Sequence, residues 1–195
     1  MNETPRYPRR IRLNDADFEL RLMGAGDEAA TLAFANGLPV HDLIFLQRDI
    51  RNSKVVAAWL AQIERGAIVS VLGLADGEIH GCAAVVRDTL SWSPQVGELR
   101  VVVSETARSG GLGRLLVQEA FALAVSLGLE KLVARMTPDQ RGAIAVFEEM
   151  GFSAEALLRD YVRDADGVKH DIVILSLDVA RHLAQRTAYG YGEAF

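Results

Sequence analysis

Short stretches in which apolar residues alternate with polar ones, or run together with many β-branched side chains, predict β-strands along this chain. These stretches cover residues 18–23, 67–74, 78–88, 97–103, 131–136, 152–164 and 169–179. The dipeptide Asp76-Gly77 separates the second stretch from the third and is typical of a tight hairpin turn. Residues 164–167, DADG, form the turn of a last hairpin. The pattern therefore predicts a sheet that contains two hairpins.

Longer amphipathic stretches with capping residues and terminal glycines predict four helices between these strands. They cover residues 28–37, 54–66, a stretch that ends near residue 127, and 139–150, with Asp27, Ser53 and Asp139 as the expected N-caps. Residues 38–52, between the first two helices, show no clear period. The strand–helix–strand unit at 97–136 predicts a right-handed crossover between two parallel strands. The fold class is therefore mixed α/β.

The length of the chain sets the expected domain organisation. Its 195 residues suit one domain, which we expect at residues 16–180. Residues 1–15 are expected to form an irregular N-terminal arm, and residues 181–195 a tail that begins helical and then frays. The last ten residues of this tail, RTAYGYGEAF, are a candidate for homodimer contacts.

Composition and charge argue against several classes of protein. No apolar run approaches the roughly 18 residues that span a bilayer, and the N-terminus has no apolar signal core. The formal net charge is −5 and no long Lys/Arg block is present, so nucleic acid is not an expected ligand. Cys82 is the single cysteine and no group of residues has metal-ligand spacing, so neither disulfides nor a metal are expected. A cytoplasmic location without membrane attachment is the simplest expectation.

Residues 107–125, ARSGGLGRLLVQEAFALAV, place three glycines at the start of an amphipathic helix. Each glycine costs a helix roughly 1 kcal/mol, so these glycines need another reason. The first N–H groups of a helix have no internal partner, the helix dipole adds positive charge there, and glycines let a ligand approach closely. Arg108 and Arg114 bracket the turn and could pair with phosphate oxygens, although Arg114 could equally be solvated. The turn therefore predicts a cradle for a phosphate or a pyrophosphate.

Three phosphate-binding motifs compete for this turn. A Walker loop needs Gly-Lys-Ser/Thr, which is absent. A Rossmann fingerprint that starts at Gly111 has Leu116 where a glycine or alanine belongs, and the next strand ends without the supporting acidic residue. The hexapeptide RSGGLG, residues 108–113, fits R/Q-x-x-G-x-G/A. It resembles the pyrophosphate loop of the GCN5-related N-acetyltransferase (GNAT) family.

The resemblance extends to both sides of the loop. The sequence VVVSETARSGGLGRLL is similar to the family's fourth strand, loop and third helix, with Glu105 in place of a frequent proline. The sequence QRGAIAVFEEMGF resembles the family's N-x-x-A-x-x-x-Y-x-x-x-G-F stretch, with Gln140 and Phe147 in place of the asparagine and the tyrosine. The order of elements matches from about residue 16 to residue 178. The resemblance implies the acyl-CoA N-acyltransferase (GNAT) fold, with a mixed central sheet of about seven strands flanked by about four helices.

The resemblance also implies acetyl-CoA as co-substrate and an N-acetyltransferase domain at residues 16–180. The residues expected to contact acetyl-CoA are Val101, Val102, Val103, Arg108, Ser109, Gly110, Gly111, Leu112, Gly113, Arg114, Gln140 and Phe147. In the family, a backbone N–H of the fourth strand, here among the three valines, stabilises the carbonyl oxygen. The same segment pairs with the amides of the pantetheine arm.

Acetyl transfer to an amine needs a base for the amine and benefits from an acid for the leaving thiolate. Glu98 is the candidate base because carboxylates on this strand often act on the amine in the family; the alternative is a pairing with Arg100. The family's usual acid is a tyrosine at the position of Phe147, where a phenyl ring cannot donate a proton. Tyr161 is the candidate replacement, and a packing role for Tyr161 or protonation by solvent are the alternatives.

The expected function is transfer of the acetyl group to a primary amine of an unidentified small-molecule or peptide acceptor, by direct attack in a ternary complex. The pair His41-Asp42 lies in the segment that lines the acceptor site in the family and could bind the acceptor, or could be a surface pair. Two other functions stay open. One is transfer from another acyl-CoA, and the other is a CoA-binding regulatory module without catalysis, which the missing tyrosine favours.

Overall fold

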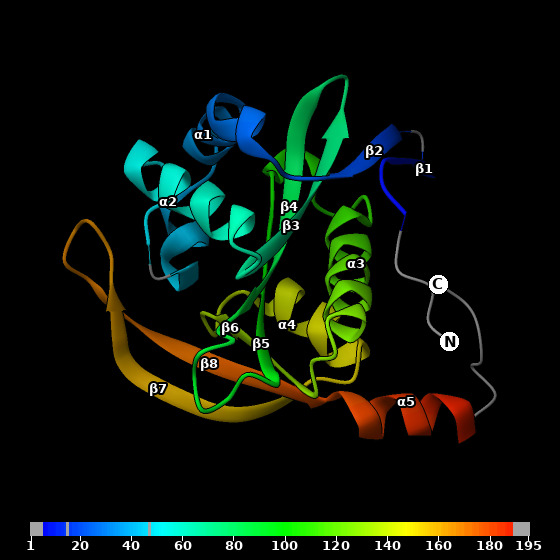
Figure 1. The fold of residues 1–195 in the computed structure, drawn as a ribbon. Coiled ribbons are helices and arrows are strands. Elements are labelled where there is room, and N and C mark those ends of the chain that lie inside the picture. The colour runs from blue at the N-terminus through cyan, green and yellow to red at the C-terminus, as the bar shows by residue number, and fades with distance from the viewer. Residues whose placement is uncertain (1–5, 15, 47, 189–195) are drawn as a thin grey trace.

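One sheet runs through the whole protein (Figure 1). The computed structural model describes residues 6–14, 16–46 and 48–188. The eight strands are β1 (Arg9–Leu13), β2 (Ala16–Leu22), β3 (Ile68–Ala75), β4 (Glu78–Arg87), β5 (Val96–Val103), β6 (Lys131–Met136), β7 (Ser153–Arg163) and β8 (Lys169–Asp178). Their order is β1-β2-β3-β4-β5-β6-β8-β7. All neighbouring pairs are antiparallel except β5 and β6, which are parallel as predicted.

Helices cover both faces of this sheet. The α-helices are α1 (Glu28–Asn36), α2 (Ser53–Glu64), α3 (Leu112–Ser126), α4 (Arg141–Glu149) and α5 (Val179–Ala188), and three 3₁₀ segments are η1 (Ala25–Asp27), η2 (Val40–Leu46) and η3 (Glu105–Ala107). The helix α3 connects the two parallel strands and lies with α4 on one face, while α1 and α2 lie on the other (Figure 1). Among the described residues, no helix combines the length and apolarity needed to cross a membrane.

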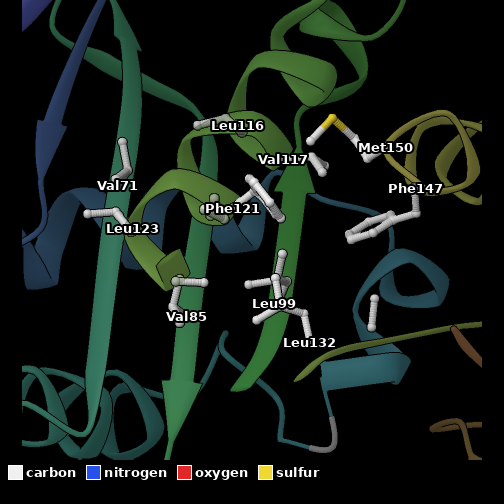
Figure 2. Packing of buried hydrophobic residues seen from close by; sticks show 14 of the residues in the cluster. Val71, Val85, Leu99, Leu116, Val117, Phe121, Leu123, Leu132, Phe147 and Met150 are labelled. Carbon is white, nitrogen blue, oxygen red and sulfur yellow. The ribbon is translucent and has the colours of Figure 1, made fainter. Parts of the chain in front are cut away.

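The largest part of the core lies between α3 and the sheet. Figure 2 shows Leu116 and Phe121 of α3 beside Val85 and Leu99 of the strands, and all four side chains are almost fully buried. The helix lies so close to β4 that a Cβ atom at Gly81 would be 2.6 Å from Cδ1 of Leu116. A glycine at this point therefore sets the distance between helix and sheet.

The prediction of an irregular N-terminal arm was wrong for residues 9–13, which form β1 and bring the sheet to eight strands. The prediction that the tail begins helical is confirmed, and α5 is the fifth α-helix of the described chain. Residues 9–13 form a strand because the chain reverses at Asn14, whose φ is 52°, and pairs back onto β2. The hydroxyl of Tyr7 donates to Glu119 of α3 at 2.6 Å, which ties the preceding segment to the core. The tail is helical to residue 188, and residues 189–195, with most of the expected dimer segment, lie outside the described residues.

Of the three expected N-caps, Asp27 does occupy the N-cap position of α1, whereas Ser53 and Asp139 each miss the N-cap position by one residue. The residue that caps α2 is Asn52, whose side chain accepts a hydrogen bond from the N–H of Lys54 at 3.0 Å, and Ser53 is already helical. Asp27 is the N-cap residue of α1, but its carboxylate binds the guanidinium of Arg21 and not an N–H of this helix. Asp139 lies one residue before the N-cap of α4. Tertiary partners therefore hold the two aspartates that local sequence assigned to caps.

Truncation of the helix–sheet contact should destabilise the fold. We expect Leu116→Ala to lower the free energy of unfolding by about 2–5 kcal/mol, because it leaves a cavity under α3. Leu90→Ala is the matched control: Leu90 is 96% exposed, so its truncation should change this energy by less than about 0.5 kcal/mol. Urea unfolding measures both, and equal effects of the two variants would contradict the packing described above.

Candidate functional site

The loop between β5 and α3 presents an uncapped helix start. Gly111 is the N-cap of α3 with a φ of 90°, a conformation that an L side chain rarely adopts. Ser109 also has a positive φ, 66°. No described side chain caps the helix, so the first N–H groups of α3 have no side-chain acceptor. The predicted glycine turn is thus a left-handed entry into α3, with its donors and the positive end of the helix dipole facing outward.

Carboxylates hold both arginines of this loop. The guanidinium of Arg108 contacts the carboxylate of Asp42 and lies 3.5 Å from the carbonyl oxygen of Val103. The guanidinium of Arg114 contacts Glu149 of α4 at the surface. The sequence predicted neither partner. The contact of Arg108 ties the glycine loop to η2, which is far away in sequence.

Beside this loop, β5 and β6 part. They pair over only four residues of each strand, from Val96 opposite Lys131 to Leu99 opposite Ala134. Beyond this point β5 pairs with β4 alone. The N–H of Ser104 donates to the carbonyl of His80 at 2.8 Å, so alternation turns the backbone groups of Val102 toward β4 as well.

The same alternation turns the backbone groups of Val101 and Val103 into the gap between β5 and β6. Two of the three predicted valines therefore have an N–H group without a strand partner, whereas the carbonyl oxygen of Val103 already lies 3.5 Å from the guanidinium of Arg108. Val102 presents its side chain instead, on the face opposite α3. The prediction of a backbone N–H donor thus narrows to Val101 and Val103.

The two residues that depart from the family pattern lie in and before α4. Gln140 is the N-cap residue of this helix, and its side-chain oxygen accepts a hydrogen bond from the N–H of Thr137 at 3.3 Å. Phe147 is 4% exposed and packs edge-on against Phe152, with ring centres 5.1 Å apart. Phe147 is therefore a core residue (Figure 2). Its contact with acetyl-CoA stays a prediction.

Arginines bind the carboxylate of Glu98, and one of them is Arg100, the partner expected if Glu98 is not the base. Its carboxylate accepts from Nε of Arg100 at 2.9 Å and from Nη2 at 3.2 Å. Nη1 of Arg135 on β6 lies 3.9 Å from the same carboxylate. The side chain of Glu98 is 16% exposed, so this cluster bridges β5 and β6 near the point where they part. The role of Glu98 as a base stays a prediction.

Two histidine–aspartate pairs lie beside the loop after β6. Nε2 of His41 is 2.6 Å from Oδ2 of Asp139, and Nε2 of His170 is 2.7 Å from Oδ2 of Asp164. The two imidazole rings meet edge-on with centres 5.3 Å apart. The hydrogen bond from His170 holds the pKa of Asp164 below its usual value. Partial burial raises the pKa of Asp139, but hydrogen bonds that include the one from His41 outweigh it and lower the pKa overall.

Tyr161 lines a hollow of about 610 Å³ between η2 and the end of β7, which we term the hairpin hollow. Its walls are Val40, Leu43, Ile44, Arg48, Asp49, Arg51, Tyr161, Val162, Arg163, Asp164 and Ala165. The tyrosine is 51% exposed, so it is neither a core residue nor close-packed. Its predicted role as acid remains a prediction.

A second, smaller hollow of about 260 Å³ lies on the same side as α1 and α2. Trp59, Val102 and Arg100 are among its walls, and Arg48 lines both hollows. No sequence pattern marks Arg48 as a site residue, because it lies in residues 38–52, which show no clear period. The described residues hold no group of three or more His, Cys, Asp or Glu side chains that could bind a metal ion.

Comparison with known proteins relates this architecture to one family. The model of the acetyltransferase (GNAT) family matches residues 39–152. A Bacillus subtilis (strain 168) protein, YwnH, provisionally named a phosphinothricin acetyltransferase, is 30% identical over 86 residues. That match covers 44% of this chain and 52% of YwnH, so the chain matches about half the length of this relative.

Solved structures share the fold at lower identity. YncA of Salmonella typhimurium, determined with its cofactor acetyl-CoA, is 19% identical with a TM-score of 0.71, over 83% of this chain and 94% of that one. Spermidine N-acetyltransferase of Vibrio cholerae, determined with CoA and spermine, is 15% identical with a TM-score of 0.70, over 85% of this chain and 98% of that one. Both likenesses concern the fold.

The left-handed conformation of Gly111 can be tested by adding a methyl group. We expect Gly111→Ala to lower the free energy of unfolding by about 1 kcal/mol, because its Cβ meets no atom within 4 Å and only the backbone is strained. The neighbouring Gly110→Ala is the matched control: its φ is not positive, and its Cβ would lie 3.5 Å from the carbonyl oxygen of Ala107, an ordinary contact. Urea denaturation compares the two, and an equal loss would contradict the left-handed entry.

Proposed function

This chain belongs to the acetyltransferase (GNAT) family, and we propose that it transfers the acetyl group of acetyl-CoA to a primary amine. One observation carries the proposal: the uncapped start of α3 lies beside two strands that part after four paired residues. The first feature suits a diphosphate, and the second leaves backbone donors for an amide-bearing arm. The similar structure of YncA, which contains acetyl-CoA, supports acetyl-CoA as the acetyl donor.

The residues present fit acetyl-CoA. A Cβ at Gly111 would meet no atom within 4 Å, so the cradle is open above the helix start. The diphosphate would be held by N–H groups of residues 109–114 and by the guanidinium of Arg108, with Arg114 available if it leaves Glu149. The pantetheine amides would pair with Val101 and Val103. The bound donor supplies an activated thioester.

The proposed reaction is a direct transfer. The amine nitrogen forms a bond to the acetyl carbon, the carbon–sulfur bond breaks, and the sulfur leaves as a thiolate that takes a proton. A backbone N–H of Val101 or Val103 donates to the carbonyl oxygen as it gathers charge. The sole cysteine, Cys82, is buried, and burial raises its pKa to about 12, so it is unsuited to carry the acetyl group.

The amine must also lose a proton, since amines with a pKa of about 8 to 10.4 are largely protonated at neutral pH. Glu98 is the proposed base, acting through water once the guanidinium of Arg100 shifts. The pair of His41 and Asp139 is a second candidate, because the imidazole is 40% exposed and oriented by a carboxylate. Tyr161 is the proposed acid for the thiolate, with solvent as the alternative.

A second function is a CoA-binding regulatory module without catalysis. Phe147 favours this alternative, because it is buried in the core and cannot supply the proton that the family's tyrosine supplies. A third possibility, transfer from a longer acyl-CoA, would use the same loop. The relatives named for phosphinothricin and spermidine support a small-molecule amine as acceptor.

Calorimetry and thiol release separate these functions. We expect the protein to bind acetyl-CoA and to release free CoA thiol with at least one member of a panel of amino acids, polyamines, aminoglycosides and peptide N-termini. Binding without thiol release on any amine would favour the regulatory module. A lack of binding to acetyl-CoA and to longer acyl-CoA esters would overturn the proposal.

The role of Arg108 can be isolated within the same binding experiment. We expect Arg108→Gln to weaken CoA binding about tenfold, because one charge-assisted contact to the diphosphate is lost. Asp42→Asn should strengthen CoA binding or leave it unchanged, because it frees the guanidinium of Arg108 from the carboxylate of Asp42. Arg65→Gln, at the exposed end of α2, is the control with unchanged affinity. Weakened binding by Asp42→Asn alone would indicate that the ion pair only holds the loop.

The role of Glu98 can be tested through the pH dependence of kcat/KM. We expect Glu98→Gln to lower kcat/KM most at low pH, where few amine molecules are neutral and a base matters most. At high pH the amine deprotonates by itself and the deficit should shrink. If Glu98 only holds Arg100 and Arg135, the variant will lower the melting temperature and leave the shape of the profile unchanged.

A further inference from the structure

The charges around the hairpin hollow do not cancel. Three arginines, Arg48, Arg51 and Arg163, and two aspartates, Asp49 and Asp164, line it. Asp49 forms two hydrogen bonds with Arg51, at 2.8 and 2.7 Å. This leaves Arg48, Arg163 and Asp164 to be accounted for.

Asp164 is also fully engaged. It accepts from Nε2 of His170 at 2.7 Å and from the backbone N–H groups of Asp166 and Val168 at 3.0 and 2.9 Å. Within the described part of the chain, Arg48 and Arg163 have neither a hydrogen-bonding nor an ion-pair partner. The hollow therefore holds two guanidiniums that no carboxylate binds, and three arginines against two aspartates make its lining net positive, although the whole chain carries a net charge of −5. Guanidiniums in this position are suited to a carboxylate or a phosphorus oxyanion.

A row of side-chain contacts connects the hollow with the proposed donor site. Asp164 of the hollow binds His170, whose ring meets the ring of His41. His41 binds Asp139, which directly precedes Gln140, and its chain neighbour Asp42 binds Arg108 of the glycine loop. The hollow is therefore separated from the glycine loop by a short row of side chains.

We infer that the acceptor is an amine that also carries an anionic group, and that Arg48 and Arg163 bind this group in the hairpin hollow. The inference rests on the proposed function and narrows its substrate class. An α-amino acid or an amino acid analogue with a phosphorus oxyanion has the required chemistry. A polyamine does not, because its remaining charges would face the two guanidiniums.

The test compares acceptors that differ only in the anionic group. Thiol release is measured with the common α-amino acids, their α-carboxamides, phosphinothricin and spermidine. We expect kcat/KM to be highest for an anionic acceptor, at least tenfold above that for its carboxamide after correction for the fraction of neutral amine. Phosphinothricin against glutamate distinguishes a phosphorus oxyanion from a carboxylate. A preference for spermidine or for the carboxamides would overturn the inference.

Variants then assign the effect to the two arginines. We expect Arg48→Gln and Arg163→Gln each to raise KM for the anionic acceptor about tenfold, while KM for acetyl-CoA stays unchanged. Arg159→Gln is the matched control, because Arg159 lies exposed on the same strand as Arg163 but outside the hollow. Both target arginines are exposed, so the melting temperatures should not change. An unchanged KM for the acceptor, or a raised KM for acetyl-CoA, would overturn the assignment.

A binding measurement separates the anion site in the hollow from the transfer reaction. Calorimetry with the CoA-loaded protein and the anionic amines should give a measurable Kd that the Arg48→Gln/Arg163→Gln variant loses. Arginine-dependent binding without thiol release would overturn the proposed transfer while supporting the hollow as an anion site. Thiol release from amines in which the two arginines play no part would support the transfer and overturn the anion site.

Discussion

The early parting of β5 and β6 is the constraint on which the rest of the site depends. β5 stays paired with β4 through Val103, and β6 stays paired with β8 through Met136, so each half of the sheet is continuous. Only the seam between the halves is short. Backbone N–H and C=O groups that have lost a strand partner must find water or a ligand, because leaving them buried and unpaired is costly. The seam therefore leaves backbone groups of Val101 and Val103 without a strand partner, and this does not depend on which side chains stand there.

The role proposed for the glycine loop depends on the position of α3, which starts beside this seam. α3 is the crossover that joins the two parallel strands, and Gly81 lets Leu116 approach β4 closely. The position of the helix start is therefore set by core packing, and its open N–H groups by the left-handed Gly111. Arg108 adds a cation that already has a partner in Asp42. Such partly exposed ion pairs contribute about 0–1 kcal/mol, so a diphosphate could displace the carboxylate at small cost.

Local sequence patterns predicted the elements that carry their own signals. The hairpin at Asp76-Gly77, the β6 strand and the glycine turn all have short-range reasons, and the structure confirms each of them. β1 escaped prediction because its pairing depends on a reversal at Asn14 that no glycine or proline marks. The segment 38–52 escaped because η2 is a 3₁₀ segment, whose period differs from that of both strand and helix.

The contacts of the site could be predicted even less, because most of them join residues far apart in sequence. Arg108 and Asp42 are 66 positions apart, and His41 and Asp139 are 98 positions apart. The pairing of Glu98 with Arg100 was within reach because two residues on one strand share a face. The pairing of Arg135 with the same carboxylate needed the register of β5 against β6, which the sequence pattern does not determine.

These pairings also mean that the net charge of the chain does not predict the charge of its ligand. Glu98, Asp42, Asp139 and Asp164 all face the site, and each is bound by an arginine or a histidine. None of these four carboxylates is therefore without a side-chain partner where a substrate would meet it. Arg48, which follows η2, and Arg163, the last residue of β7, have no such partner among the described residues, so the lining of the hairpin hollow is net positive whereas the chain carries a net charge of −5. Coulomb interactions weaken with distance and with salt, so a ligand in the hollow responds to the guanidiniums within a few ångströms rather than to the overall charge.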